Sequence, residues 1–246
     1  MIKSLHQKQF RDQNGLFVAE GEKLVTELLG SEYLPEVVVV KDSPAADIVG
    51  ILDKYSDIGI PVYTAPKHQF DQLCDTKTPQ KILAVVNQKD QAIMPGEPFI
   101  ALDGVSDPGN VGTIIRSAEW FGFKQVILGR DTADIYNPKT VRSTMGAIFK
   151  VQAITAPNLS EAIVESFKGY KIYAADVEGE KDLGSMKPAS KFGIIFGSEA
   201  HGLSEQLNTV IDERFSIPGY GSSESLNVSV AAGITLYHFA AKRKIK

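Results

Sequence analysis

Short, largely apolar segments separated by helical patterns constrain the fold of this chain more than any other feature. After residue 98 these segments are FIALD (99–103), QVILG (125–129), KIYAAD (171–176), FGIIFG (192–197) and RFSIP (214–218). Strands without a polar face are typical of parallel sheets that are covered by helices on both sides. We therefore expect an α/β fold with a mostly parallel sheet in this part of the chain.

The first part of the chain predicts a smaller α/β domain. Strand-like segments at 37–40, 61–64 and 81–86 alternate with helical patterns such as EGEKLVTELL. A polar stretch with two prolines and one glycine follows, and this composition is typical of a linker. We divide the chain into a small domain at 1–90, a linker at 91–98 and a larger domain at 99–246.

Cysteine and histidine usage argues against a disulfide-bonded protein and against a structural metal site. Cys74 is the only cysteine, so no intramolecular disulfide can form and a reducing compartment is indicated. The four histidines are scattered and do not match a metal-ligand spacing. The N-terminus lacks the apolar core of a secretory signal, and no apolar run approaches the length of a membrane span. We expect a cytoplasmic protein that holds no structural metal and does not enter a membrane.

The charge of the chain argues against a strongly basic nucleic-acid binder. The net charge is −4, from 26 basic and 30 acidic residues. Basic residues nevertheless gather at both ends, at 1–11 without an acid and again at 242–246. Such local patches can attract phosphate despite an acidic average, although charged termini are often only solvated.

The first segment that can carry chemistry is LDGVSDPGNVGTIIRSAEWFGF, at 102–123. Its Asp-Pro-Gly-Asn turn follows an apolar strand, and Asn110 is placed to cap the next helix. Arg116 lies opposite the apolar face of that helix, beside Thr113 and Trp120. Arg116 is then either a solvated surface residue or a cation at the carboxyl end of a strand, where open α/β sheets bind ligands.

The second segment, FGIIFGSEAHGL at 192–203, runs from an apolar strand into a turn that contains glycine. A glycine at 197 allows a backbone to approach a ligand closely. Glu199 at the end of the strand can bind a hydroxyl group or cap the next helix. A ligand-binding turn and an ordinary strand-to-helix connection both stay open.

The third segment, IPGYGSSESLNVSVAAGITLYHF at 217–239, begins with a loop of two glycines and three serines. We expect the following helix to begin near Ser225. Small residues in this helix permit close packing within the domain or across a dimer. A buried C-terminal helix explains the small residues, but it does not explain the Gly/Ser loop ahead of them.

Several common motifs are absent from the sequence. No G-x-x-x-x-G-K-[ST] occurs, which excludes a P-loop, and no G-x-S-x-G hydrolase turn occurs. Gly219 and Gly221 lack the third glycine of a dinucleotide fingerprint, because Glu224 stands in its place. Pattern and spacing thus predict an α/β protein with a ligand site built from three loops.

The three segments, in this order, resemble the motifs of the TrmH/SpoU family of RNA ribose methyltransferases within the SPOUT superfamily. The resemblance runs from Phe99 to the C-terminus and includes NPKTVRSTMGAIFKV at 137–151. FVAEGEKLVTELL resembles the small substrate-binding domain of many members, which is similar to a ribosomal protein of the large subunit. The resemblance implies a trefoil-knotted domain, S-adenosyl-L-methionine as cofactor, and a homodimer with active sites at the interface.

The resemblance also implies the residues of the site. It assigns the catalytic surroundings to Asn110, Arg116, Glu199, Ser225 and Asn227. It assigns the cofactor pocket to Ala175, Phe196, Gly197, Ile217, Pro218, Gly221, Ser225 and Leu226. One departure from the family pattern is Gly219, at a position that is commonly Met after Ile-Pro. This change alters the packing of the pocket but removes no functional group.

The implied reaction is attack of a ribose 2′-hydroxyl on the methyl group of a sulfonium. Because guanidinium keeps its proton at neutral pH, we expect Arg116 to bind the adjoining phosphate or the developing alkoxide. We expect Glu199 to hold Arg116 or Asn110 in position. RNA is the expected partner, because the 2′-hydroxyl distinguishes it from DNA, and the N-terminal domain favours ribosomal over transfer RNA. A base-methylating SPOUT enzyme and a non-catalytic RNA-binding module are the alternatives.

Overall fold

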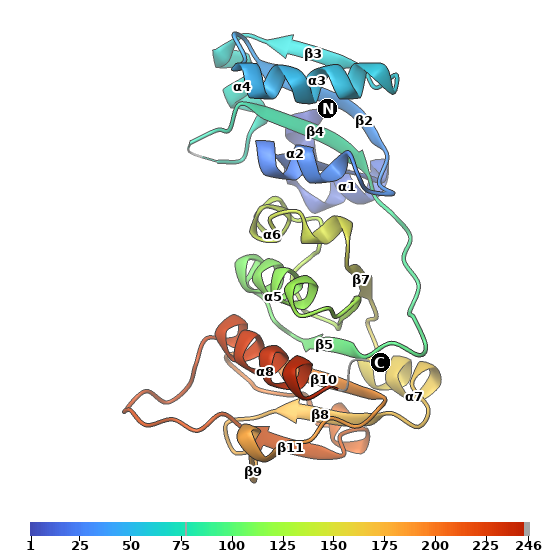
Figure 1. Ribbon diagram of the computed structural model, residues 1–246, viewed down its shortest axis with the longest axis vertical. Coiled ribbons are helices and arrows are strands. Elements are labelled where there is room, and N and C mark those ends of the chain that lie inside the picture. Colours follow the sequence, from blue (N-terminus) through green and yellow to red (C-terminus); the bar gives the residue numbers. More distant parts are fainter. Residues whose placement is uncertain (77, 244–246) are drawn as a thin grey trace. The chain divides into compact units, whose positions relative to one another are not determined.

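The computed structural model describes residues 1–76 and 78–243. The chain forms two compact units, the first of Met1–Asp90 and Asp134–Phe149, the second of Gln91–Ala133 and the chain from Lys150 onward. Figure 1 shows their helices and strands. No helix of the described residues is long and apolar enough to cross a membrane. Within the same residues, no group of three or more His, Cys, Asp or Glu side chains is placed to hold a metal ion.

The second unit is built on a seven-stranded sheet with the strand order β7-β6-β5-β10-β8-β11-β9, in which all neighbouring strands are parallel. The strands are β5 (Phe99–Asp103), β6 (Gln125–Leu128), β7 (Gln152–Thr155), β8 (Lys171–Ala175), β9 (Lys181–Asp182), β10 (Phe192–Gly197) and β11 (Glu213–Ser216). The predicted α/β fold is therefore confirmed, and each of its predicted strands is present. The implied trefoil knot stays a prediction.

Helices cover both faces of this sheet. On one face α5 (Pro108–Trp120) packs beside α8 (Val228–Lys242), whose Phe239 meets the ring of Phe192 with centroids 5.3 Å apart. On the other face α7 (Leu159–Ser166) contributes Leu159 and Ile163 to a buried cluster with Ile195 of β10. The 3-10 helices η3 (Leu183–Ser185) and η4 (Glu205–Thr209) complete the unit. This double cover explains why the strands lack a polar face.

The first unit is built on a four-stranded sheet with the order β1-β4-β2-β3. Its strands are β1 (Leu16–Glu20), β2 (Pro35–Lys41), β3 (Val62–Ala65) and β4 (Ile82–Asn87). β4 is antiparallel to β1 and β2, whereas β2 and β3 are parallel. The accompanying helices are α1 (Lys8–Asn14), α2 (Glu22–Leu28), α3 (Ala46–Asp57), α4 (Lys67–Leu73) and the 3-10 helix η1 (Ile2–His6).

Residues 134–149 belong to the first unit, although they lie far along the sequence. They form α6 (Pro138–Ser143) and the 3-10 helix η2 (Ala147–Phe149). Tyr136 packs on Phe17 with ring centroids 4.6 Å apart, and Asp134 accepts a 2.5 Å hydrogen bond from Arg11, 123 positions away. The domain boundaries at 90 and 99 stay a prediction. The structure adds that the chain comes back to the first unit at 134–149.

The predicted linker lies against the second unit. The backbone of Met94 exchanges two hydrogen bonds of 2.9 Å with the side chain of Gln125. The N–H of Gly96 donates to the hydroxyl of Tyr170 at 2.7 Å. The segment 91–98 is therefore hydrogen-bonded through its backbone to the rest of the larger unit.

The basic residues at the chain ends are mostly used inside their own units. Arg11 is 2% exposed and donates to the carbonyl oxygens of Leu5 and His6 at 2.9 Å, so it contributes no exposed charge to the basic stretch at 1–11. Lys242 donates to the carbonyl of Gly184 at 2.8 Å. Lys244 and Lys246 lie outside the described residues.

Candidate active site

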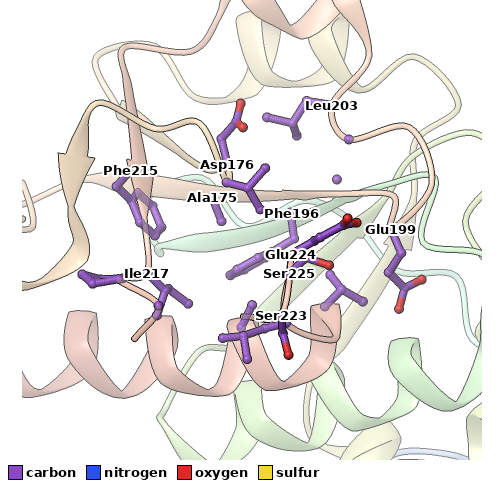
Figure 2. Close-up of a pocket in the computed structure, with 18 of the residues that line it drawn as sticks. Ala175, Asp176, Phe196, Glu199, Leu203, Phe215, Ile217, Ser223, Glu224 and Ser225 are labelled. Atoms are coloured by element: carbon purple, nitrogen blue, oxygen red, sulfur yellow. The ribbon is translucent and has the colours of Figure 1, made fainter. Parts of the chain in front are cut away.

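A cavity of about 760 Å³ opens at the carboxyl ends of β8, β10 and β11. Ala175 and Asp176 border it after β8, Phe196 and Gly197 border it at the end of β10, and the loop ahead of α8 forms the remaining wall. Figure 2 shows side chains from these segments around one space. The volume is in the range of roughly 300–1,000 Å³ that is typical of small-molecule sites.

The residues that were predicted to bind the cofactor come together here. The cavity is lined by Ala175, Phe196, Gly197, Ile217, Pro218, Gly221, Ser225 and Leu226. Glu199 and Ser225, which were predicted to be catalytic, line it as well. Their contact with a cofactor stays a prediction, but the structure places all of them at one cavity.

Three of the predicted catalytic side chains form a hydrogen-bonded group beside the cavity. The amide of Asn110 donates to Oε1 of Glu199 at 2.5 Å. The amide of Asn227 donates to the same oxygen at 3.3 Å and to Oδ1 of Asn110 at 3.1 Å. Glu199 and Asn227 are exposed. This group, the Asn110–Glu199–Asn227 group, therefore presents polar atoms to solvent and to an incoming molecule.

Asn110 does not cap α5, contrary to our expectation. The N-cap is Asp107, whose carboxylate accepts the backbone N–H of Asn110 at 3.0 Å. Pro108 occupies the first helical position, where its missing N–H has no helical partner to lose. Because Asp107 caps the helix, the side chain of Asn110 is able to bond to Glu199.

A closed turn fixes the position of Glu199. Ser198 and Gly202 exchange two backbone hydrogen bonds of 2.9 Å on either side of it. A Cβ at Gly197 would lie 2.5 Å from the carbonyl oxygen of Gly202, so only glycine fits at 197. The close approach predicted for Gly197 is therefore made by the chain's own backbone. The idea that Glu199 caps the next helix is wrong, because η4 begins later and Glu199 accepts the two amides instead.

Asn227 joins the start of α8 to the same group. The helix begins at Val228 and not near Ser225, as the sequence had led us to expect. Oδ1 of Asn227 accepts the backbone N–H of Ser229 at 3.0 Å and its hydroxyl at 2.6 Å. Its amide nitrogen then reaches Asn110 and Glu199, so one side chain both caps the helix and completes the group.

Arg116 and Ser225 lie outside this group. Arg116 is on the exposed face of α5 with Thr113 and Trp120, as predicted, and its guanidinium pairs with no residue that the structure describes. Glu199 therefore does not hold Arg116. The hydroxyl of Ser225 is likewise without a partner in the described part of the chain.

Acidic side chains dominate the charge of the cavity. Asp176, Glu199 and Glu224 line it, and none of the described residues around it is Lys, Arg or His. Apolar surface comes from residues such as Phe196 and Leu226. This combination suits a ligand that carries a positive charge and an apolar part.

Two of these acids were missed by the sequence reasoning. Asp176 directly follows β8 and pairs with Arg214. Its place at the carboxyl end of an apolar strand was an available signal, because open parallel sheets bind ligands at that edge. Glu224 lies in the irregular loop before α8, where no periodic pattern predicts which way a side chain faces.

Comparison with known proteins matches both parts of the chain. Residues 97–237 match the SpoU rRNA Methylase family, and residues 1–84 match the MRM3-like substrate binding domain. The 23S rRNA (guanosine(2553)-2′-O)-methyltransferase of Bacillus subtilis is 34% identical to this chain. That match covers 96% of this chain and 93% of the Bacillus protein.

Solved structures differ in how much of the chain they match. The AdoMet-bound rRNA methyltransferase of Sinorhizobium meliloti is 28% identical, covers 100% of this chain and 94% of its own, and has a TM-score of 0.87. The TrmH/SpoU tRNA modifying enzyme of A. aeolicus is 25% identical with a TM-score of 0.54. It covers 61% of this chain and 76% of its own. The similarity to the first structure thus includes the N-terminal part of the chain.

Proposed function

This chain belongs to the SpoU rRNA methylase family, and from that premise we propose that it transfers a methyl group from S-adenosylmethionine to a ribose 2′-hydroxyl of ribosomal RNA. The observation that carries the proposal is the Asn110–Glu199–Asn227 group beside an acidic cavity. Methyl transfer needs a cofactor site next to an RNA site, because the ribose oxygen, the methyl carbon and the sulfur have to be aligned.

The cavity fits S-adenosylmethionine in charge and in the nature of its walls. When bound, this cofactor supplies a methyl group that is made electrophilic by a sulfonium cation. The carboxylates of Glu199 and Glu224 favour a positive charge, whereas Asp176 is already paired with Arg214. Phe196 and Leu226 offer apolar surface for an adenine ring. Backbone groups of 218–226 make no hydrogen bond to a described residue, so they are open to polar atoms of a ligand.

We assign the acceptor site to the Asn110–Glu199–Asn227 group. Oε1 of Glu199 accepts both amides, which leaves Oε2 to accept a hydrogen bond from a ribose hydroxyl. Such a bond orients the oxygen for attack. The hydroxyl of Ser225, at the cavity wall, is proposed to form a hydrogen bond to the cofactor.

Arg116 offers a positive charge outside the cavity. Its exposed guanidinium is on the same helix as Asn110 and is open to an anion. We assign it to the phosphate next to the acceptor ribose or to the alkoxide that develops on the oxygen. The hydroxyl proton then leaves to water or to a phosphate oxygen, because a guanidinium already carries its proton.

Ribosomal RNA is the proposed substrate and transfer RNA the alternative. The Bacillus relative, named for 23S rRNA, is similar over nearly the whole chain, whereas the tRNA enzyme covers 61% of it. The N-terminal unit, which matches a substrate binding domain, then selects the RNA. A ribosomal substrate places the reaction in the cytoplasm.

We propose that the active form is a homodimer. Val230, Ile234 and Tyr237 form an exposed stripe on α8, and Trp120 stands 80% exposed on the neighbouring α5. Apolar surface of this kind on adjacent helices is typical of an interface. A second copy of the chain would cover it.

The direct test is methyl transfer from radiolabelled S-adenosylmethionine to 23S rRNA transcript and, separately, to bulk tRNA. Nuclease digestion and mass spectrometry then identify the product. We expect a 2′-O-methylnucleoside in the ribosomal RNA, at a position that resists alkaline cleavage. Label only in tRNA would refute the substrate, a methylated base would refute the ribose reaction, and no label in either RNA would refute catalysis.

A further inference from the structure

Tyr220 is the most exposed large apolar side chain of the described residues, at 99%. It lies between Gly219 and Gly221 in the loop that leads from β11 to α8. Its ring and hydroxyl contact no residue that the structure describes. One exposed aromatic residue is not unusual by itself. The position of Tyr220, however, connects it to the proposed reaction.

The loop that carries Tyr220 is fixed only at its two ends. Residues 218–226 make no hydrogen bond to any described residue, whereas β11 precedes the loop and the cap residue Asn227 follows it. In Figure 1 the loop extends outward from its unit, on the left of α8. Tyr220 can therefore change position without breaking a hydrogen bond to a described residue.

The two flanking glycines support this freedom. Neither Gly219 nor Gly221 has a positive φ, and a Cβ added to either would meet no atom within 4 Å. The observed conformation therefore does not need glycine at these positions. Glycine does lower the cost of reaching other conformations, so the pair suits a loop that rearranges when a ligand arrives.

The same loop leads to the reaction site. Tyr220 borders the cavity, as do Ile217 and Leu226. The residue that follows the loop is Asn227, whose amide bonds to Glu199 and Asn110. An RNA that presents a ribose to this group has to approach from solvent, to which the ring of Tyr220 is exposed.

We propose that Tyr220 stacks on an unpaired base of the RNA substrate, at or next to the nucleotide that is methylated. This inference rests on the proposed function. Proteins that bind unpaired RNA stack its bases on aromatic side chains, and every base offers a face for this contact. The adenine of the cofactor is the other available ring. The near-complete exposure of Tyr220 favours RNA, because the ring stands in solvent and not against the cavity walls.

The test compares the unaltered protein with Tyr220→Phe and Tyr220→Leu. Phenylalanine keeps the ring, whereas leucine keeps an apolar side chain without an aromatic face. Val164→Ala, at a 58% exposed position on α7, is the control for an unrelated surface change. KM and kcat are measured with 23S rRNA transcript, and the dissociation constant of S-adenosylmethionine is measured by calorimetry.

We expect Tyr220→Leu to raise KM for the transcript by on the order of 10-fold or more, as the loss of one stacked base predicts. Tyr220→Phe and Val164→Ala should match the unaltered protein, and cofactor affinity should be the same in all four. A 4-thiouridine-substituted transcript should crosslink at residues 219–221.

An unchanged KM in Tyr220→Leu would overturn the inference. An equal loss of cofactor affinity would also overturn it and place the ring over adenine, and a change of oligomeric state would place the ring between two copies of the chain. Failure of the proposed function is a separate result, because the unaltered protein would then not methylate the transcript. In that case the same variants are compared by their affinity for the transcript, measured by fluorescence anisotropy.

Discussion

Two amides, from Asn110 and Asn227, donate to one carboxylate oxygen of Glu199 at 2.5 and 3.3 Å. Hydrogen bonds to a charged group contribute about 1.5–3 kcal/mol each, so this oxygen holds both amides in place. The backbone turn that Ser198 and Gly202 close holds the carboxylate of Glu199 in position. At the scale of single residues, the site depends on Glu199 for its geometry more than for its charge alone.

Glu199→Ala should therefore slow the reaction more than it weakens cofactor binding. We expect turnover to fall by on the order of 100-fold, since at least one charged hydrogen bond is lost while most cavity walls remain. Glu199→Gln, which keeps an acceptor oxygen, should lie between Ala and the unaltered protein. Single-turnover kinetics and calorimetry measure the two effects. An equal loss of cofactor affinity would instead assign Glu199 to cofactor binding.

The substitution Arg116→Lys tests whether the proposed role of Arg116 depends on its charge alone or also on the geometry of its guanidinium. Lysine keeps the positive charge but loses the planar fork that binds a phosphate through two hydrogen bonds. We expect turnover on 23S rRNA to fall by about 10-fold, with cofactor affinity unchanged because Arg116 does not line the cavity. Near-normal turnover in Arg116→Lys would show that a single positive charge suffices.

At the scale of elements, the capping residues decide where the functional side chains stand. Asp107 caps α5 and Asn227 caps α8, and both helices thereby begin at the Asn110–Glu199–Asn227 group. From the sequence we expected Asn110 to cap α5 and α8 to begin near Ser225, and both expectations differ from the structure. Several polar residues precede each helix, and only the path of the loop decides which of them meets the free backbone N–H groups.

Removing the Asp107 cap should both destabilise the second unit and disturb the Asn110–Glu199–Asn227 group. Asp107→Ala leaves the backbone N–H of Asn110 without its partner, which costs about 1 kcal/mol, whereas Asp107→Ser keeps a capping oxygen. Urea unfolding measures the stability and methyl transfer measures the site. Equal stability of Asp107→Ala and the unaltered protein would contradict the capping role.

Most strands of the larger sheet were predictable because they are largely apolar, as in β5 and β10. β7 and β9 were missed, since Gln152–Thr155 begins and ends with polar residues and Lys181–Asp182 has too few residues to show a pattern. The walls of the cavity were identified by motif resemblance. The bonds between Asn110 and the other two members of its group were not predictable, because they join residues 89 and 117 positions apart.

At the scale of the whole molecule, the exposed stripe on α8 predicts self-association. We expect a mass of about twice the 26.8 kDa of one chain in sedimentation equilibrium. Ile234→Glu and Tyr237→Glu put a charge into the stripe and should give monomers, since an unpaired charge is costly to bury. Val164→Glu, on the exposed face of α7, should leave the mass unchanged. A monomeric unaltered protein would contradict the homodimer.

The central claim is that segments far apart in the sequence converge on one cavity that holds the methyl donor beside the Asn110–Glu199–Asn227 group. A crystal structure with S-adenosylhomocysteine, the demethylated product, tests it most directly. We predict ligand density between Ala175, Gly197 and the loop at 217–226. Density instead in the neighbouring cavity of about 630 Å³, which Arg130 and Asn158 border, with the first cavity empty, would contradict it.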